Sequence, residues 1–504
     1  MFGELDRHGR IRLGLPEYTL AISTCAKAEQ WQLALQIFSG MGKAKVVPSV
    51  ISYNAAISSC QKGPWQLAVH LFNSMRKVEP DVISYSATMS SCEKGREWEL
   101  ALHLFDRMPK ARLFPDAVSY NASISSCEKG QQWQLALHFF HGMSKAEVHP
   151  DVISYNATIS SCEKAQQWQL ALYSFTSMPN ALMNPSIISY SAAISSCEKG
   201  QQWQLALHLH TRMHMAKVIP DVIGYSATIS SCEKVGRWQL ALHLFDEMPQ
   251  AKLVPDAVSC NATISSCEKG QQWQLALHLF ACMPKAKIHP SLISYNATIS
   301  SCQKGAQWQL ALHIFHGIRR AKLQHDVVSY NAAISSCHAG HWEVALHLFH
   351  SMPLAQVIPT IVSYNAVLEA VFEKDQGYGL FLQAAELEIY EKLSRKGPTF
   401  LDLHDRSAGA AWMAVRWWLL EVLPPLLSRK TSRNCTIITG WGKSRPSWVK
   451  SDLRGFILKM LRSHGIAADI QAGNQGRLLL ELKMQDLVKL DFELSFRPLA
   501  IPAL

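Results

Sequence analysis

The sequence predicts an all-α solenoid of stacked helical hairpins, followed by a small two-layer α/β domain. Ten cysteines recur every 35 residues, apart from one interval of 32: Cys25, Cys60, Cys92, Cys127, Cys162, Cys197, Cys232, Cys267, Cys302 and Cys337. Ten tryptophans, from Trp31 to Trp342, keep the same rhythm, whereas residues 399–485 follow a different pattern. A repeat of this length indicates a solenoid, because one unit cannot bury its apolar face alone and must stack on its neighbours.

Each repeat is predicted to hold two helices. In residues 117–151, apolar side chains stand at positions i, i+4 and i+7 twice, starting from Tyr120 and again from Trp133. This spacing predicts two antiparallel helices with one apolar stripe each. Gly130 is expected to end the first helix as a C-cap glycine, and Pro150 to stop the second.

Composition and charge narrow the class of protein. The chain is 48% hydrophobic and 17% charged, as in a soluble, well-packed protein, and its longest apolar stretch, Trp417 to Leu427, is too short to cross a bilayer. The net charge of +10 suits a polyanionic partner, and residues 398–504 hold 15 Lys and Arg against 9 Asp and Glu. The first residues lack the apolar core of a signal peptide and carry acidic side chains. We therefore expect either a cytosolic chain or one without its leader, and no membrane partner.

Three positions of the repeat stay restricted where packing does not require it. The fifth residue is a small hydrogen-bonding one: Thr19, Asn54, Ser86, Asn121, Asn156, Ser191, Ser226, Asn261, Asn296, Asn331 and Asn365. The last residue is a small donor or acceptor: Ser49, Asp81, Asp116, Asp151, Ser186, Asp221, Asp256, Ser291, Asp326 and Thr360. The second residue is aliphatic: Ile51, Ile83, Val118, Ile153, Ile188, Ile223, Val258, Ile293, Val328 and Val362.

This triplet fits the reading of a nucleobase. An amide or hydroxyl beside a carboxylate offers donors and acceptors to a Watson–Crick edge, and an aliphatic side chain can wedge against the face of the base. Helix capping is the competing interpretation, because Asn, Ser and Asp are the usual N-cap and turn residues. Capping explains the residue types, but not why Asn and Ser vary at one position while Asp and Ser vary at another.

The repeats resemble the pentatricopeptide repeat family through Val-Ile-Ser-Tyr-Asn at residues 152–156 and Val-Ile-Pro-Asp at 218–221. The resemblance covers about residues 15–395 and implies a right-handed superhelix of ten to eleven repeats. It also implies sequence-specific binding of single-stranded RNA, one base per repeat, in RNA processing or stabilisation in a chloroplast or mitochondrion. A tetratricopeptide-type protein scaffold, which has similar hairpins, is the alternative. The restricted residues at the fifth and last positions favour RNA, since a peptide groove would vary more in size and charge.

The family's pairing rules, carried over by this resemblance, give a target sequence. Asn with Asp implies U, Ser with Asp implies G, and Asn with Ser or Thr implies a pyrimidine (Y). The nine pairs from Asn54/Asp81 to Asn331/Thr360 then imply U-G-U-Y-G-G-Y-U-Y, read 5′ to 3′. The Thr19/Ser49 pair of the first repeat receives no assignment.

The recurring cysteines and histidines have simpler explanations. No C-x-x-C pair occurs, and the ten helix cysteines lie one per repeat, so we expect buried packing thiols rather than disulfides or zinc ligands. One histidine per repeat, as at His208 and His243, is replaced by Tyr173 in one repeat. This series is expected at a solvated or half-buried helix position.

The segment after Lys396-Gly397-Pro398 is predicted to alternate strands and helices. Its expected elements are a strand at 399–404, a helix capped by Ser407 and running to Leu423, a strand at 435–439, a helix at 451–463, and strands at 467–471 and 477–482. The order β-α-β-α-β-β predicts a small two-layer α/β domain.

This segment resembles the small MutS-related (Smr) domain, through Leu401-Asp402-Leu403-His404 and Thr439-Gly440-Trp441-Gly442. Some members of that family nick nucleic acids. Asp402 and His404 stand at i and i+2 on the predicted strand, so they share a face. His404 could act as general acid or base, and Asp402 could orient it or hold a divalent cation such as Mg²⁺ or Mn²⁺.

The second motif suits a phosphate. Gly440, Gly442 and Lys443 could seat a phosphate on backbone N–H groups and a cation, with Trp441 stacked on a base. Asp405 stands where the family usually has glycine. The alternative for this domain is binding of the nucleic-acid backbone without hydrolysis.

Overall fold

The computed structural model describes residues 4–5, 11–12, 14–75, 78–337, 339–371, 374–390, 393, 397–404, 406–427, 433–439, 453–471 and 476–483. The chain separates into an N-terminal part, residues 1–262, and a C-terminal part, residues 263–504. Across the described residues, no helix is both long and apolar enough to cross a bilayer.

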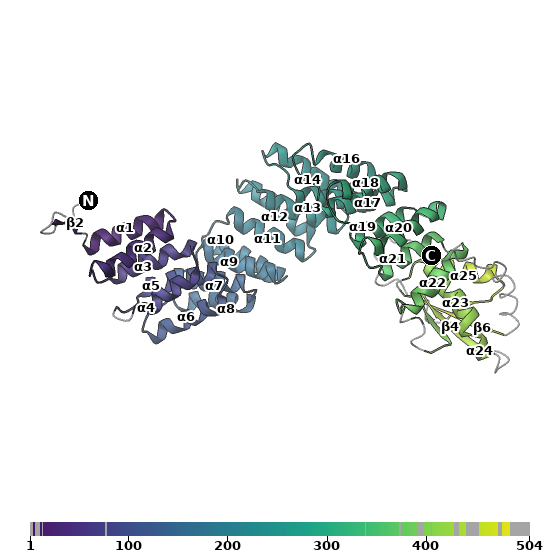
Figure 1. The fold of residues 1–504 in the computed structure, drawn as a ribbon, viewed down its shortest axis with the longest axis horizontal. Helices are drawn as coiled ribbons and strands as arrows, with labels where there is room; N and C mark the ends of the chain where they lie inside the picture. The colour runs from purple at the N-terminus through teal and green to yellow at the C-terminus, as the bar shows by residue number, and fades with distance from the viewer. Residues whose placement is uncertain are drawn as a thin grey trace. The chain divides into compact units, whose positions relative to one another are not determined.

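The N-terminal part is a stack of helical hairpins (Figure 1). It starts with an antiparallel strand pair, β1 (Glu4–Leu5) and β2 (Ile11–Arg12). The hairpins are α1 (Leu15–Lys27) with α2 (Trp31–Lys43), α3 (Val50–Ser59) and the 3₁₀ turn η1 (Cys60–Lys62) with α4 (Trp65–Ser74), α5 (Val82–Lys94) with α6 (Trp98–Lys110), α7 (Ala117–Lys129) with α8 (Trp133–Lys145), α9 (Val152–Lys164) with α10 (Trp168–Asn180), α11 (Ile187–Lys199) with α12 (Trp203–Met215), and α13 (Val222–Lys234) with α14 (Trp238–Gln250).

The C-terminal part continues the same pattern. After α15 (Ala257–Lys269), which spans the division, come α16 (Trp273–Cys282), α17 (Leu292–Lys304) with α18 (Trp308–Arg320), α19 (Val327–Ser336) with the 3₁₀ turn η2 (Ala339–His341) and α20 (Trp342–Leu354), and α21 (Ile361–Val371) with α22 (Asp375–Glu386). The predicted helical-repeat solenoid is therefore confirmed.

The apolar stripes hold the hairpins together. The first helix α7 contacts its own second helix α8, the preceding second helix α6 and the next first helix α9. Ile124 and Cys127 of α7 are fully buried between these neighbours. A phenylalanine of one second helix meets the tyrosine of the next first helix edge-on, as Phe175 meets Tyr190 with centroids 5.0 Å apart. Such edge-to-face pairs add directional packing to apolar burial.

The turn between the two helices differs from the expectation for Gly130. Its φ of −80° is ordinary, and the left-handed conformation falls on the next residue, Gln131, at φ 57°. The glycine instead gives room to a neighbouring ring, since a Cβ on Gly130 would lie 2.5 Å from Cγ of Trp98 in the preceding repeat, although Ala165 and Val235 stand at the same place in other repeats. The prediction of a C-cap glycine was right about the helix end and wrong about the cause.

The cysteines are packing residues, as predicted. All thirteen are free, and nine of the ten helix cysteines are buried, Cys25 being intermediate. Burial raises the pKa of Cys162 to about 11, so this thiol stays neutral and unreactive. The exposed positions of His208 and His243 also agree with the expectation for the histidine series.

The C-terminal segment contains a four-stranded sheet of order β3-β4-β6-β5. Its elements are β3 (Phe400–Asp402), α23 (Ala408–Trp417), the π-helical turn η3 (Trp418–Val422), α24 (Pro424–Leu427), β4 (Arg433–Ile438), α25 (Leu453–Ser463), β5 (Asp469–Ile470) and β6 (Arg477–Leu482). Strand β4 runs parallel to β3 and antiparallel to β6. The elements follow the predicted order, with α24 in addition.

Candidate functional site

The fifth and last residues of a repeat lie side by side, although about 30 residues separate them. The Asn54 Nδ2 donates to Asp81 Oδ1 at 3.0 Å. The other side-chain hydrogen bonds between such pairs are Asn121 to Asp151 at 3.1–3.2 Å, Asn156 to Ser186 at 3.5 Å, Ser191 to Asp221 at 2.9 Å, Ser226 to Asp256 at 3.3 Å and Asn296 to Asp326 at 3.2–3.3 Å. The fold thus brings together residues that the sequence grouped only by position.

Two pairs lack this direct bond. The Ser86 hydroxyl donates instead to the backbone oxygen of Ile83 at 3.2 Å, and not to Asp116. The Asn331 Oδ1, beside Thr360, is buried without a hydrogen-bond partner. Asn261 and Ser291 each take part in a hydrogen bond or other contact.

The last residue also caps the next first helix. The Asp151 Oδ1 accepts a hydrogen bond from the Ser154 N–H at 2.8 Å, and the Ser154 hydroxyl reaches Asn121 Oδ1 at 2.6 Å. The capping interpretation is therefore correct for these carboxylates, and the same network includes the fifth residue of the preceding repeat. The serine and the carboxylate together fix which side of the Asn121 amide carries oxygen and which carries nitrogen.

The carboxylate of Asp81 is held as an anion. Burial alone would raise the pKa of Asp81, but hydrogen bonds from the Ser84 N–H, the Asn54 amide and the Ser84 hydroxyl outweigh it and lower the pKa. A negative charge therefore stays at this position at neutral pH.

The aliphatic second residue has no packing role. All ten of these side chains, from Ile51 to Val362, are 54–67% exposed. Each stands in the first turn of a first helix, beside the capping residue, as Ile153 stands beside Asp151 in α9. Single exposed aliphatic residues are ordinary, but the same exposed position in ten successive repeats indicates a functional surface.

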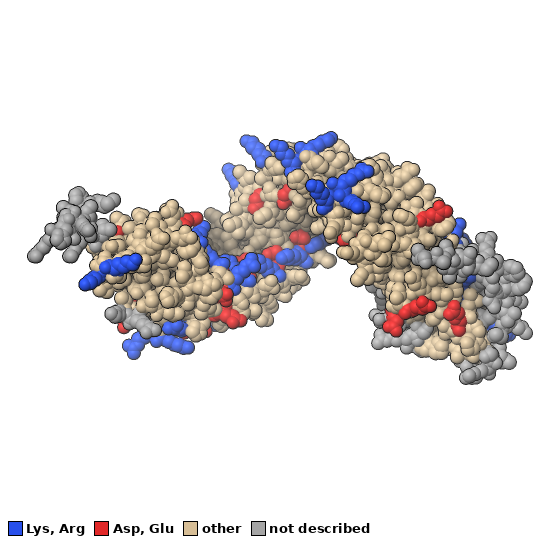
Figure 2. Space-filling model, viewed as in Figure 1, with Lys and Arg blue, Asp and Glu red and all other residues tan. Residues whose placement is uncertain are grey.

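A row of ion pairs links successive first helices. These ion pairs were not predicted from the sequence. The Lys164 Nζ lies 2.8 Å from the Glu128 carboxylate of the preceding repeat. The equivalent pairs are Lys129–Glu93, Lys199–Glu163, Lys234–Glu198 and Lys304–Glu268, at 2.5–3.0 Å. Lys62 pairs with Glu29 at 3.1 Å, at a different spacing. Figure 2 shows basic side chains in a row with acidic ones beside them near α7 and α9. The signal in the sequence was a glutamate 36 residues before a lysine.

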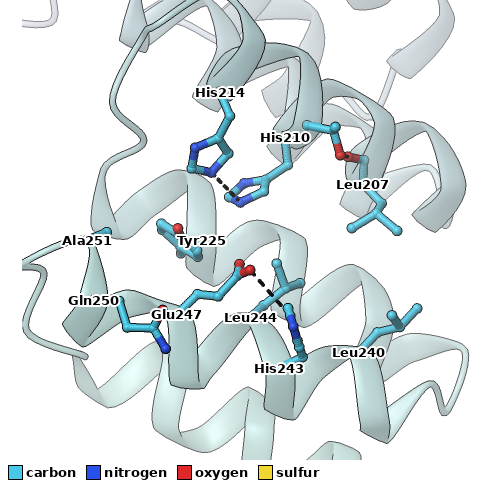
Figure 3. Close-up of a pocket in the computed structure, with 11 residues that line it drawn as sticks. Leu207, His210, His214, Tyr225, Leu240, His243, Leu244, Glu247, Gln250 and Ala251 are labelled. Carbon is cyan, nitrogen blue, oxygen red and sulfur yellow. Dashed lines mark hydrogen bonds and ion pairs between the residues drawn. The ribbon is translucent and has the colours of Figure 1, made fainter.

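One interface between repeats differs from the rest. His210 occupies the place of the usual phenylalanine and meets Tyr225 at 4.6 Å between ring centroids. Its Nε2 lies 3.3 Å from that of His214, and the pair faces His243 and Glu247 across a cavity of about 550 Å³ (Figure 3). Burial lowers the pKa of His210 to about 4, with a smaller contribution from His214.

These side chains do not form a metal centre as they stand. In the part of the chain that the structure describes, no three His, Cys, Asp or Glu side chains are gathered around one point for a metal ion.

The predicted catalytic pair is brought together at the end of β3. His404 Nδ1 hydrogen-bonds Asp402 Oδ1, and the His404 N–H donates to the same oxygen at 3.1 Å. The His404 side chain is 54% exposed. The predicted phosphate-binding residues Gly440, Trp441, Gly442 and Lys443 lie outside the described residues, as does Asp405.

Comparison with known sequences identifies the repeats. The chain matches the PPR repeat family at residues 115–164 and 220–269, the pentatricopeptide repeat domain at 1–62, 70–129 and 313–373, and the PPR repeat at 51–78. Together these matches cover more than half of the 504 residues. No curated protein matches the chain significantly.

Solved structures of low identity are also similar. The pentatricopeptide repeat protein PPR10 from maize is 19% identical with a TM-score of 0.43, covering 91% of this chain and 60% of its own. PPR10 in complex with an 18-nucleotide psaJ RNA element is 16% identical with a TM-score of 0.34, covering 84% and 74%. Yeast Rmd9p in complex with a 16-nucleotide target RNA is 11% identical with a TM-score of 0.34, covering 82% and 86%. On its repeats and these sequence matches, the chain belongs to the pentatricopeptide repeat family.

Proposed function

We propose that the array binds single-stranded RNA, with one base held at each repeat. The observation that carries this proposal is the row of ten exposed aliphatic side chains, each beside a polar pair. A base inserted between two successive members of the row would bury apolar surface on both faces. Its edge would then meet the fifth and last residues of the repeat. The match to pentatricopeptide repeats, some of which are solved with bound RNA, supports the choice of ligand.

The hydrogen-bond network sets what each pair offers to a base. In the Asn121/Asp151 pair, the amide oxygen accepts a hydrogen bond from the Ser154 hydroxyl, and one amide N–H donates to the Asp151 carboxylate. An amide N–H and carboxylate lone pairs remain, which complement the acceptor and N–H donor of a uracil edge. In the Ser191/Asp221 pair, the hydroxyl donates to the carboxylate, so mainly acceptors face the base. Acceptors suit the two adjacent donors of guanine.

The expected target is therefore U-G-U-Y-G-G-Y-U-Y. Fluorescence anisotropy with this oligonucleotide should give an affinity that falls with added salt, because phosphate contacts release counterions. Changing all three G bases to A should weaken binding by roughly tenfold or more per base, since one mismatch costs about 1–3 kcal/mol in protein–nucleic acid interfaces. Equal affinity for both oligonucleotides would refute base reading. Absence of salt-dependent binding would refute RNA binding and favour the tetratricopeptide-type scaffold.

A substitution within the array gives a matched control. Ser226→Asn turns the Ser226/Asp256 pair into the Asn/Asp combination already present at Asn121/Asp151, with Ser259 in the place of Ser154. The preferred base at the sixth target position should change from G to U, while the preference at the other positions stays the same.

For the C-terminal segment we propose an Smr-like domain that cleaves the bound RNA. The exposed His404, oriented by Asp402, supports it, because an imidazole fixed at Nδ1 can exchange a proton at Nε2. Cleavage should be lost in both Asp402→Ala and His404→Ala at unchanged RNA affinity. EDTA should abolish it and Mg²⁺ or Mn²⁺ restore it if Asp402 holds a cation. Activity that survives both substitutions would refute the assignment, and binding without cleavage by the wild type would leave a backbone-binding module.

By its family we assign this work to a chloroplast or mitochondrion, in RNA processing or stabilisation. Expression of the chain with its complete native 5′ coding sequence, fused to a fluorescent protein, tests the compartment.

A further inference from the structure

The last hairpin is followed by a helix that takes the place of another repeat. Helix α23 contacts α21 as α21 contacts the preceding first helix, α19. The approach is close, because a Cβ on Gly409 would lie 2.5 Å from the backbone oxygen of Leu368. The Gly409 N–H donates to Glu369 Oε2 at 2.7 Å. Helix α23 is therefore seated on α21 as the next first helix would be.

Ser407 then stands where the last residue of a repeat would stand. It is the N-cap of α23, and its Oγ accepts from the Ala410 N–H at 3.3 Å, the distance at which Ser186 accepts from the Ser189 N–H in α11. Its hydroxyl also donates to the backbone oxygen of Asn365 at 2.9 Å. Asn365 is the fifth residue of this last repeat, so the polar pair is present although 42 residues separate its members.

The Asn365 amide is oriented as in other repeats, by a different donor. Elsewhere the amide oxygen accepts from a serine in the next first helix, as Asn156 Oδ1 does from Ser189 at 2.6 Å. Helix α23 has Ala410 at that position, and the Tyr390 hydroxyl donates to Asn365 Oδ1 at 3.3 Å instead. The Tyr390 ring is held by stacking on Phe381 and by the Arg406 guanidinium, 4.6 Å from its centroid.

A cavity of about 270 Å³ opens at this pair. Its lining includes Val362, Asn365, Glu369 and Ser407. Val362 is the exposed aliphatic second residue of this repeat, 55% exposed. Glu369 stands where the preceding repeat has Ser335, so it adds a carboxylate that the other reading sites lack.

We propose that these four residues form a further nucleotide site, completed by the C-terminal segment and selective for cytosine. Val362 covers the face of the base, and Asn365 and Ser407 meet its edge. The Glu369 carboxylate accepts from the exocyclic amino group, a contact typical of cytosine N4. Uracil has an acceptor at that place and is disfavoured. This inference rests on the proposed RNA binding and extends the target by one base, to U-G-U-Y-G-G-Y-U-Y-C.

The test compares nine- and ten-nucleotide RNAs on the full chain by fluorescence anisotropy. A 3′ C should tighten binding about tenfold over the nine-nucleotide RNA, and more than a 3′ U or a C added at the 5′ end. Asn365→Ala should abolish this gain without changing affinity for the nine-nucleotide RNA. Glu369→Gln, which keeps an oxygen for the Gly409 N–H, should remove the preference for C over U.

Ser407→Asp changes the proposed site at Ser407 without removing the N-cap of α23. Asp is an equally good N-cap, so α23 should remain folded, and the site acquires the Asn/Asp combination of the repeats expected to read U. The preference should then move from C toward U. If the wild type binds the nine-nucleotide RNA but gains no more from a 3′ C than from a 5′ C, the further site is refuted and the array function stands. If neither RNA binds, the proposed function itself fails.

Discussion

Two stripes of aliphatic residues run along the same first helices, one of them buried and the other exposed to solvent. In α9, Ile159 is fully buried between hairpins, whereas Ile153, six residues earlier, is 60% exposed. The buried stripe is explained by packing. The exposed stripe is kept through ten repeats without any contact that requires it.

The difference shows that different positions of one 35-residue repeat serve packing and the outer surface. Interior positions can be nearly identical in every repeat, because each must fit the same neighbours. The Asn, Ser and Asp residues at the fifth and last positions are buried or half-buried at the helix caps, yet they change from Asn to Ser, or from Asp to Ser, between repeats of the same fold. The array can therefore vary its polar pairs while its fold stays constant.

The largest expected effect comes from separating the two stripes by substitution. Ile159→Ala should lower the free energy of unfolding by about 2–5 kcal/mol, because it leaves a cavity in a close-packed interface. Ile153→Ala should change it by less than about 0.5 kcal/mol, as surface substitutions do, but should weaken RNA binding. Denaturant unfolding and anisotropy measure the two effects. A large loss of stability in Ile153→Ala would mean that the exposed stripe is structural after all.

The buried packing between repeats has one place where pH should act on it, at His210 of the second helix α12. His210 is neutral when folded, since burial lowers its pKa to about 4 against about 6.5 in an unfolded chain. The unfolded state binds the proton more readily between these values, so stability should fall as pH drops from about 6.5 to 4. The loss approaches about 3 kcal/mol, at roughly 1.4 kcal/mol per pH unit.

His210→Phe restores the residue found at this place in other repeats and provides the control. Stability should become less dependent on pH in this range, and the mid-array amides should exchange more slowly at pH 5. His214, Tyr225, His243 and Glu247 line the same cavity and remain in both proteins. An unchanged pH profile in the variant would show that one of these groups, rather than His210, carries the effect.

Sequence periodicity was enough for the hairpins, because spacing at i, i+4 and i+7 determines which side of a helix is buried. It was also enough to group Asn121 with Asp151, although not to show that they touch. The sequence could not predict contacts between residues that lie outside the repeat spacing and meet only in the folded chain. Ser407 lies 42 residues after Asn365, outside the repeat spacing, and only the seating of α23 on α21 brings them together.

The role of Gly130 was also beyond the sequence. A glycine at a helix end predicts a left-handed turn in general, and nothing in the local sequence reveals a tryptophan ring from the preceding repeat. The Glu–Lys ion pairs were not predicted from the sequence for a similar reason. Their partners are neighbours only because first helices stack in parallel register.

A smaller effect is expected at the one interface between repeats where cysteine replaces the usual tyrosine. Cys260 is 4% exposed and stands where other repeats have the tyrosine. Cys260→Tyr should restore an edge-to-face pair with Phe245, like that of Phe280 with Tyr295 at 4.9 Å, and raise the free energy of unfolding by about 0.5–1.5 kcal/mol. Thermal unfolding measures it. A lower melting temperature would show that neighbouring side chains have filled the space.

The smallest effect should come from the ion pairs between first helices. The Lys164 side chain is 43% exposed, and its pair with Glu128 is screened by solvent. Lys164→Ala should therefore lower the free energy of unfolding by no more than about 0.5 kcal/mol at 0.1 M salt, and by less at 1 M. Lys145→Ala, at an exposed helix end, is the control. If Lys164→Ala instead weakens RNA binding and flattens its salt dependence at unchanged stability, the lysine row belongs with the exposed stripe as part of the RNA surface.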